Sequence, residues 1–436
     1  MSARASEPSS SVALLPDRRV SAAVFLVGGV AFVVLAWLLV PWQWVPGGHY
    51  QHVSAAEVFS SQQIRRAEHY SSLQRHLSWT GLAVSLAVSV LLGFTRLGRV
   101  LVGRLPGPWW VRVPLGALAV LIVGALATLW FNIRLQHNEL RFGLSSQSWS
   151  GWWRDLLVSL LVTWVGTGIV LLVVFALIRA LPRTWPAAVA VAAVALAFAG
   201  SFVYPVVVEP LFNKFTPMPA GQLRSEILHL ADIEHVRVSD VLVADASRRT
   251  STLNAYVSGF GSSRRVVVYD NLIKDLPRDE VLAVIAHELG HARHQDVLLG
   301  TTLGAAGGVA GVGLLGLLLG WPGLRRRAGE PENATTPADP VLVPLVLALA
   351  ALGTFVVSPV ENTISRAIEA RADRASLTAT HDVTAFDAVQ KRLAVSSLAD
   401  PIPPQWGQIW FGTHPTALQR IGIAAALRRS LVSSPR

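Results

Sequence analysis

The sequence predicts a mainly α-helical integral membrane protein with seven transmembrane helices and a small α+β domain that carries a short β-sheet. The membrane class follows from composition: 52% of the 436 residues are hydrophobic, only 15% are charged, and the mean hydropathy is +0.46. Soluble proteins do not combine these values. The smaller domain follows from two polar segments, one of which contains β-branched stretches.

Seven uncharged stretches of about 20 residues are long enough to cross a bilayer, where charged side chains and unpaired backbone groups are costly. Charged residues lie close to the ends of each stretch, and tryptophans gather there, which is typical of membrane interfaces. The predicted spans are residues 20–40, 77–95, 113–133, 156–178, 184–208, 297–321 and 340–360.

The first and sixth spans have further features. The Ser-rich residues 1–19 predict a disordered tail, and the span after them is too long for a signal-peptide core, so we interpret it as an uncleaved anchor. The sixth span repeats glycine at intervals of four in two series, which predicts close packing of helix backbones. These glycines are Gly300, Gly304 and Gly308, with Gly307 and Gly311.

Two polar segments, residues 209–296 and 361–436, are separated by the sixth and seventh spans, residues 297–360. Because two crossings lie between them, both segments emerge on the same membrane face and can form one domain, beside the five spans of residues 20–208. Within the first segment, two stretches alternate or are β-branched, and these predict a small sheet. The stretches are residues 236–244 and 254–270.

The charge and the lack of cysteine restrict partners and cofactors. An excess of Lys and Arg gives a net charge of +10, and we expect it to meet anionic lipid headgroups, because no basic cluster is interleaved with aromatic residues. Membrane lipids are therefore expected partners, and nucleic acid is not. Since the chain contains no cysteine, a metal site must use His, Asp or Glu.

The segment 277–296 contains the sequence H-E-x-x-H on a predicted helix, which opens with a proline and two acids. The i, i+4 spacing places His287 and His291 on one face, able to hold one zinc ion, and Glu288 lies within reach of a metal-bound water. In a chain with 12 His, a chance match has a probability of roughly 0.01. His294 is expected to be a surface histidine.

A catalytic zinc needs a third protein ligand and an open position for water. After the seventh span, Asn362, Arg366, Glu369 and Asp373 are spaced to form one stripe along a helix face. One interpretation makes Glu369 the third ligand, Asp373 an acceptor for a ligand imidazole N–H, and Arg366 a cation paired with a carboxylate. The alternative is a solvated helix with i, i+4 charge pairs, and the spacing alone does not decide between them.

Six blocks of sequence resemble the type I CAAX prenyl proteases, a family of membrane-embedded zinc metalloendopeptidases with seven transmembrane helices. The resemblance covers most of the chain and implies a zinc protease domain with one Zn²⁺ per chain, whose third ligand is Glu369. The blocks occur in family order: EPLFNKFTPMP at 209–219, RRTSTLNAYVSGFG at 248–261, VVVYDNLI at 266–273, AHELGH at 286–291, SRAIEARAD at 365–373 and THPTALQRI at 413–421.

The resemblance also implies roles for residues that spacing does not assign. Asn254, Ala255 and Tyr256 match the edge strand along which a substrate lies extended. His414, in a His-Pro pair that opens a helix, matches a residue that stabilises the tetrahedral oxyanion, and Arg420 follows it as in the family pattern. From the sequence alone, His414 is also compatible with a helix-capping histidine, and Asn254 with a turn residue.

These expectations describe a zinc endopeptidase that cleaves peptide or protein substrates, whose lipidation the sequence leaves open. Zinc lowers the pKa of bound water to about 7, Glu288 acts as general base, and His414 opposes charge on the tetrahedral intermediate. Two alternatives remain: an intramembrane metalloprotease, and a non-enzymatic polytopic membrane protein with a structural metal site closed by a fourth ligand. Charged residues around the motif favour a position at or above the interface rather than inside a span.

The distribution of Lys and Arg does not fix the membrane orientation. The N-terminal tail and the short loops of one face carry 12 Lys and Arg residues, whereas the short loops of the catalytic face carry 6. Lys and Arg near the span ends raise the number on the catalytic face to 11. The family's site faces the cytosol. The resemblance therefore implies a multi-pass protein of the cell membrane with its catalytic face in the cytoplasm.

Overall fold

Seven long apolar helices are present in the computed structural model, which describes residues 15–43, 45, 50–259, 261, 264–330 and 337–433. Each predicted span corresponds to one of them, so the seven-helix expectation is confirmed for these residues. Residues 1–14 of the predicted tail lie outside the described residues. The helices are α1 (Arg18–Leu39), α3 (Ser61–Phe94), α5 (Trp109–Phe142), α6 (Trp149–Ala180), α7 (Trp185–Val203) continued by the π-turn η2 (Tyr204–Val208) and α8 (Glu209–Phe212), α12 (Asp296–Leu319) and α14 (Val343–Thr380).

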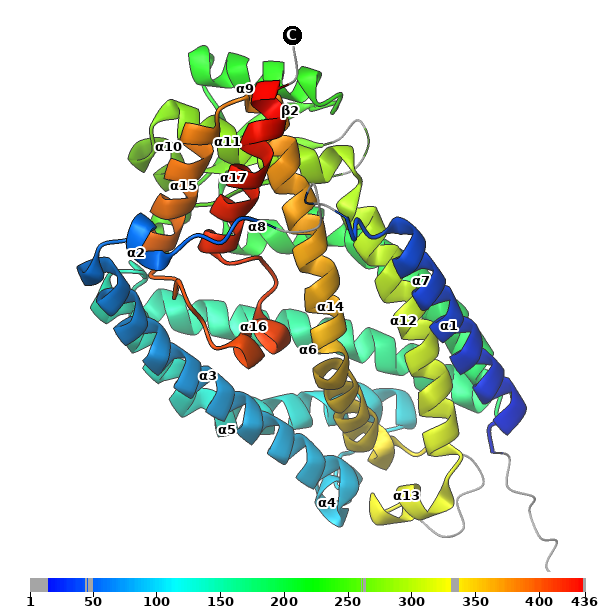
Figure 1. Ribbon diagram of the computed structural model, residues 1–436. Coiled ribbons are helices and arrows are strands. Elements are labelled where there is room, and N and C mark those ends of the chain that lie inside the picture. The colour runs from blue at the N-terminus through cyan, green and yellow to red at the C-terminus, as the bar shows by residue number, and fades with distance from the viewer. Residues whose placement is uncertain are drawn as a thin grey trace, which may run out of the picture.

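Several of these helices continue beyond the predicted spans. α3 begins early because Ser60 and Gln63 form a capping box, with backbone-to-side-chain hydrogen bonds of 2.9 and 3.2 Å. α14 runs without interruption from the membrane region to Thr380, so the predicted boundary at residue 360 falls inside one helix. In Figure 1 this helix, drawn in gold and orange, joins the membrane region to the domain above it.

The polar segments form an α+β domain around a four-stranded sheet, which confirms the predicted fold class. The strand order is β1-β2-β4-β3, in which β2 (Asp240–Ala244) and β4 (Arg265–Tyr269) are parallel. β3 (Ala255–Ser258) pairs with β4, and β1 (Phe215–Pro217) pairs with β2, both in antiparallel fashion. β3 is therefore an edge strand. β1 was not predicted, because three residues ending in proline carry little strand signal.

Shorter helices surround the sheet and connect the spans. α9, α10 and α11 belong to the first polar segment, and α15, α16 and α17 follow α14 in the second. Their bounds, with those of the short connecting elements, are α2 (Ala55–Val58), α4 (Arg96–Gly103), α9 (Gln222–Ile233), η3 (Ala246–Arg248), α10 (Asp270–Asp275), α11 (Arg278–Arg293), α13 (Pro322–Arg327), η5 (Pro340–Leu342), α15 (Val383–Ser396), α16 (Gln405–Phe411) and α17 (Ala417–Ser433).

Helix α11 packs between the sheet and α14. One face shares a hydrophobic core with β2, β3, β4 and α9. On the other face, Gly290 approaches α14 so closely that an added Cβ would lie 2.7 Å from the Cβ of Ala375. The buried Ser376 of α14 also donates a hydrogen bond to the carbonyl of Ala283, at 2.7 Å. These contacts fix the distance between the two helices that carry the candidate site.

Most glycines of the predicted stripe on α12 do not have the packing role that their spacing suggests. The closest approach to α1 is made by Gly313, which lies against the backbone of Phe25. The stripe instead lines a cavity of about 1690 Å³, whose walls come from α1, α6, α7, α12 and α14. The stripe glycines with open space where a Cβ would stand are Gly300, Gly304, Gly308 and Gly311.

Candidate active site

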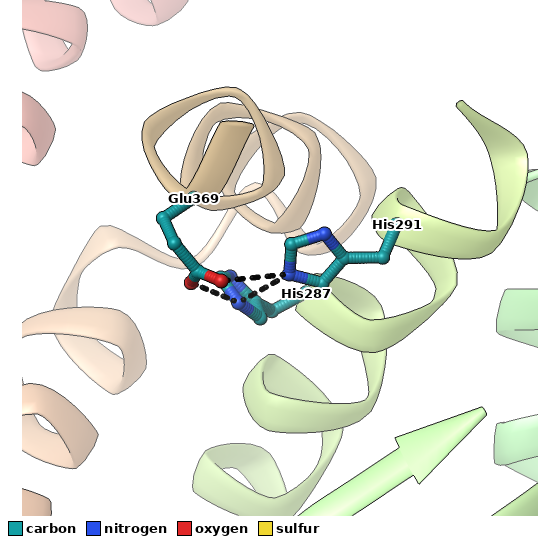
Figure 2. A group of neighbouring side chains, drawn as sticks. All are labelled: His287, His291 and Glu369. Carbon is teal, nitrogen blue, oxygen red and sulfur yellow. Dashed lines mark hydrogen bonds and ion pairs between the residues drawn. The ribbon is translucent and has the colours of Figure 1, made fainter. Parts of the chain in front are cut away.

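His287 and His291 project from one face of α11 toward α14. They lie one helical turn apart, and their Nε2 atoms are 3.1 Å from each other (Figure 2). His287 is buried and His291 is half-buried. His294, three residues further on, is exposed, in agreement with the expectation of a surface histidine.

Glu369 reaches the same point from α14, as Figure 2 shows. Its Oε2 atom lies 3.3 Å from Nε2 of His287, and its Oε1 atom lies 3.5 Å from Nε2 of His291. One ligand atom from each of the three residues lies within 4.8 Å of the others. Glu369 Oε2 is buried and accepts no hydrogen bond from the described residues. A bound cation would satisfy this oxygen.

The three side chains fit a zinc ion. Tetrahedral zinc with bonds of about 2.0–2.1 Å separates neighbouring ligand atoms by roughly 3.3 Å. The two Nε2 atoms are 3.1 Å apart, and they lie 3.3 and 3.5 Å from the two different oxygens of the Glu369 carboxylate. Burial lowers the pKa of His287, but the neighbouring carboxylates of Asp373 and Glu369 outweigh burial and raise this pKa to about 9. The pocket therefore favours a positive charge.

Asp373 and Arg420 support His287. The Oδ1 atom of Asp373 lies 3.0 Å from Nδ1 of His287, and the carboxylate is fully buried. Arg420, on α17, donates from Nε to both oxygens of this carboxylate, at 3.0 and 2.9 Å. Because an ionised carboxylate only accepts, Nδ1 of His287 carries a proton, which leaves Nε2 as the nitrogen that would bind a metal.

Asp296 gives His291 an equivalent support that was not predicted from the sequence. Its Oδ2 atom lies 2.8 Å from Nδ1 of His291, and Arg371 of α14 pairs with its other oxygen. Asp296 is the first residue of α12, and Gln295 before it has a φ of 55°. This left-handed residue ends α11 and turns Asp296 back toward the imidazole. The only signal in the sequence was an acidic residue five positions after His291. Whether its side chain points toward His291 depends on the turn at Gln295.

Arg366 does not form the predicted ion pair with a carboxylate among the described residues. It donates to the carbonyls of Gln408 and Gly412, at 2.9 and 2.6 Å, because α16 packs against this part of α14 and presents its last carbonyls there. Asn362 donates to another carbonyl of α16. The first half of the predicted stripe therefore holds the segment that leads to His414, and the second half, Glu369 and Asp373, contacts the two histidines of α11.

His414 and Glu288 lie beside the three converging side chains. His414 Nε2 lies 3.4 Å from Oε1 of Glu369, while its Nδ1 is 2.8 Å from the hydroxyl of Thr413. Glu288 follows His287 directly and lines the cavity of about 1690 Å³. Burial raises the pKa of the Glu288 carboxyl. A raised pKa suits a group that both accepts and releases a proton near neutral pH.

The residues assigned to substrate binding lie at the outer edge of the described sheet. Ala255 and Tyr256 are in β3, and Asn254 precedes it and accepts a hydrogen bond from the backbone of Tyr269, at 3.1 Å. Since bonding alternates along an antiparallel pair, the N–H and C=O groups of Ala255 and Val257 point away from β4. Tyr256 and Val257 also line the large cavity.

Comparison with known proteins supplies the family. The model for peptidase family M48 matches residues 217–428, and the model described as the CAAX prenyl protease N-terminal domain, with five membrane helices, matches residues 43–214. The chain belongs to peptidase family M48. This M48 protein is a multi-pass membrane metalloprotease.

Individual relatives agree with this assignment. CAAX prenyl protease 1 of Saccharomyces cerevisiae is 32% identical over 154 residues, which cover 35% of this chain and 34% of that protein. YhfN, an uncharacterized metalloprotease of Bacillus subtilis, is 26% identical over 372 residues, or 84% of this chain and 86% of the relative. The crystal structure of S. mikatae Ste24p shares the fold, with a TM-score of 0.73 at 19% identity, over 93% of this chain and 99% of that one.

The position of the motif separates this M48 protein from an intramembrane metalloprotease. The H-E-x-x-H sequence lies on α11, and this helix is not one of the seven described helices that are long and apolar enough to cross a membrane. The match to a peptidase family also disfavours a membrane protein without enzymatic activity.

Proposed function

We propose that the protein is a zinc-dependent endopeptidase in which His287, His291 and Glu369 hold one Zn²⁺ per chain. The observation that carries this proposal is the convergence of their ligand atoms within 4.8 Å, next to Glu288 and at the wall of a large cavity. When bound, zinc lowers the pKa of a coordinated water to about 7 and polarises the peptide carbonyl.

The side chains around the ligands perform the proton transfers. Glu288 takes a proton from the attacking water and delivers it to the leaving amine. His414 donates from Nε2 to the oxygen on which negative charge develops. Asp373, held by Arg420, fixes the His287 ring so that its Nε2 lone pair stays directed at the metal position.

Substrates are proposed to be peptides or proteins at the membrane, including lipidated ones. The cavity that reaches Glu288 is lined mainly by apolar residues and glycines of the spans, so a lipid chain attached to a substrate would find an apolar environment there. Residues 209–296 and 361–436 are proposed to form the catalytic domain, and residues 20–208 and 297–360 the membrane domain that encloses this cavity.

The direct test is mass-spectrometric mapping of peptides incubated with the purified, zinc-loaded protein. We expect internal peptide bonds to be cleaved, cleavage to stop when a chelator removes the metal, and zinc to restore it. Stoichiometric zinc without any cleavage would favour a structural metal site instead.

Replacing Val257 with proline tests whether substrate pairs with β3. Proline removes a backbone N–H that points to the outer edge, and proline is tolerated on edge strands in that position. Loss of one hydrogen bond to substrate should lower kcat/KM about 3 to 10-fold, with zinc content and thermal stability unchanged. The control is Val257→Ala, which keeps the N–H. Equal kcat/KM values for the two variants would show that substrate binds elsewhere.

Asp296→Asn tests the support of His291. Asparagine keeps the shape but removes the charge that orients the Nδ1–H, so zinc affinity should fall about 10 to 100-fold, the usual effect of losing such a partner. Zinc dissociation constants, measured by competition with a chelating dye, should rise similarly for Asp296→Asn and Asp373→Asn. Asp279→Asn, an exposed acid at the start of α11, is the control. An unchanged zinc affinity in Asp296→Asn would show that Asp296 does not support His291 as a metal ligand.

The catalytic face is proposed to lie in the cytoplasm. Because the chain contains no cysteine, single cysteines report accessibility without background. Lys274 is exposed on the domain, and Arg104 is exposed in the loop between α4 and α5, which the crossings place on the opposite face. An impermeant maleimide should label Arg104→Cys in intact cells. It should label Lys274→Cys only after the cells are permeabilised. The reverse pattern would place the catalytic face outside.

A further inference from the structure

The large cavity of about 1690 Å³ has a charged side chain in its wall that the proposed mechanism does not use. This side chain is Glu361 of α14, which is exposed. It is the first charged residue of α14, because the preceding part of the helix, residues 343–360, is uncharged and belongs to the seventh span. Ionisable residues of membrane helices that border a cavity commonly mark the path of a substrate.

Glu361 lies in the middle of the face of α14 that borders the cavity. The cavity-lining residues recur along this helix at intervals of three and four, which places them on one side. The side chain of Glu361 therefore points into the cavity. Its neighbours on this face are Ala350, Thr354, Val357, Ser365 and Ile368.

The other acidic side chains in the described wall of this cavity have partners or proposed roles. Glu288 is the proposed general base, Glu369 is a proposed zinc ligand, and Asp296 contacts His291 at 2.8 Å. By contrast, the Glu361 carboxylate forms no ion pair and accepts no hydrogen bond within the part of the chain that the structure describes. Its negative charge is therefore available to a ligand inside the cavity.

The surroundings of Glu361 favour a cation as that ligand. Arg264 is the only Lys or Arg among the described residues that line the cavity, and it does not pair with Glu361. Most of the other lining residues are apolar or glycine, and such walls screen a charge less than bulk water does. The open glycines of α12 leave room for a long side chain in the same cavity.

We propose that Glu361 selects a Lys or Arg side chain of the substrate, about three or four residues from the scissile bond. This proposal rests on the proposed function, which places that bond at His287, His291 and Glu369. Glu361 precedes Glu369 by eight positions on one helix, which corresponds to about 12 Å along its axis. An extended chain advances about 3.3 Å per residue. A substrate that extends from the metal position into the cavity would therefore bring its third or fourth residue within reach of Glu361.

Two variants of Glu361 change its charge in steps. Glu361→Gln removes the negative charge and keeps the size of the side chain. Glu361→Lys reverses the charge at an exposed helix position, where lysine is a good helix former. The matched control is Glu68→Lys, which makes the same change in net charge at an exposed residue of α3 outside the wall of the large cavity.

The experiment is cleavage-site profiling of a peptide library by the zinc-loaded, full-length protein and these three variants, followed by kcat/KM for matched Lys and Glu peptides. We expect the wild-type protein to favour Lys or Arg at a position about three or four residues from the cleaved bond. The kcat/KM ratio of Lys over Glu there should fall about 10-fold in Glu361→Gln. It should fall about 100-fold in Glu361→Lys, because reversal replaces an attraction with a repulsion of similar size. Glu68→Lys should keep the wild-type ratio.

Ionic strength separates a direct charge effect from a change in packing. Dissolved ions screen the attraction between a carboxylate and a cationic side chain. The Lys over Glu ratio of the wild-type protein should therefore decrease as salt is added. In Glu361→Gln the ratio should not depend on salt, because the charge that salt screens is absent.

The outcomes separate this proposal from the proposed function. If the wild-type protein cleaves the library without favouring a basic residue at these positions, the proposal is refuted while the peptidase stands. The same holds if Glu361→Gln, which changes only the charge, keeps the wild-type ratio, and this variant decides if Glu361→Lys fails to fold or to hold zinc. If the zinc-loaded wild-type protein cleaves nothing, the proposed function itself fails, and this proposal fails with it.

Discussion

Replacing Glu288 with glutamine is expected to abolish peptide hydrolysis while zinc stays bound. Glutamine keeps the size of the side chain but cannot take the proton of the attacking water, and a positioned general base typically contributes 10² to 10⁴-fold, in order of magnitude. Glu288 is not one of the three side chains that converge to hold a metal, so metal content should stay at one zinc per chain. Peptide turnover by mass spectrometry and zinc by atomic absorption, on one preparation, check both parts.

The matched control for Glu288→Gln is Asp279→Asn, which removes an exposed carboxylate from the first turn of the same helix. It should retain full turnover and full zinc. A Glu288→Gln protein with undiminished activity would require another base, and one that loses its zinc would make Glu288 a ligand.

Glu369→Ala should remove both zinc and activity. The substitution takes away one of three protein ligands and a negative charge, and two imidazoles alone hold zinc weakly. We expect the metal to dissociate during dialysis. Glu369 is buried, and its Oε2 accepts no hydrogen bond from the part of the chain that the structure describes. Alanine there leaves the two imidazoles facing a small void, and the helix pair α11–α14 is still held at Gly290 and Ser376.

The order of damage identifies the third ligand. Asp373→Ala should weaken zinc binding only about 10 to 100-fold, because its carboxylate acts through His287. Glu361→Ala, on the same helix and in the cavity wall, should leave zinc unchanged. If Glu369→Ala retained stoichiometric zinc while Asp373→Ala lost it, the third ligand would lie one helical turn further along α14.

The parts of the fold that periodicity determines were predictable from the sequence. The seven spans follow from runs of uncharged residues, and the positions of His287 and His291 follow from helical spacing. The stripe on α14 placed Glu369 and Asp373 on one face, although spacing left a solvated helix equally open. That this face of α14 packs against α11 could not be predicted, because the contact depends on Gly290 and on how two helices distant in the sequence pack together.

Features that depend on turns or on distant packing were not predictable. Asp296 reaches His291 only because Gln295 adopts a left-handed conformation, which nothing in its residue type demands. Arg366 meets carbonyls of α16 and not a carboxylate, since α16 lies more than 35 residues later in the chain. The glycines of α12 have the spacing that is typical of close helix packing, yet most of them line the large cavity. The same spacing places small residues along one face of a helix, and the sequence does not show whether that face meets another helix or a cavity.

An anomalous difference map at the zinc edge, from crystals of the full-length Glu288→Gln protein, tests the metal centre most directly. One peak should appear within bonding distance of His287 Nε2, His291 Nε2 and a carboxylate oxygen of Glu369, with no fourth protein ligand. A peak elsewhere, or one coordinated by a fourth side chain such as His414, would contradict a catalytic zinc held by these three residues.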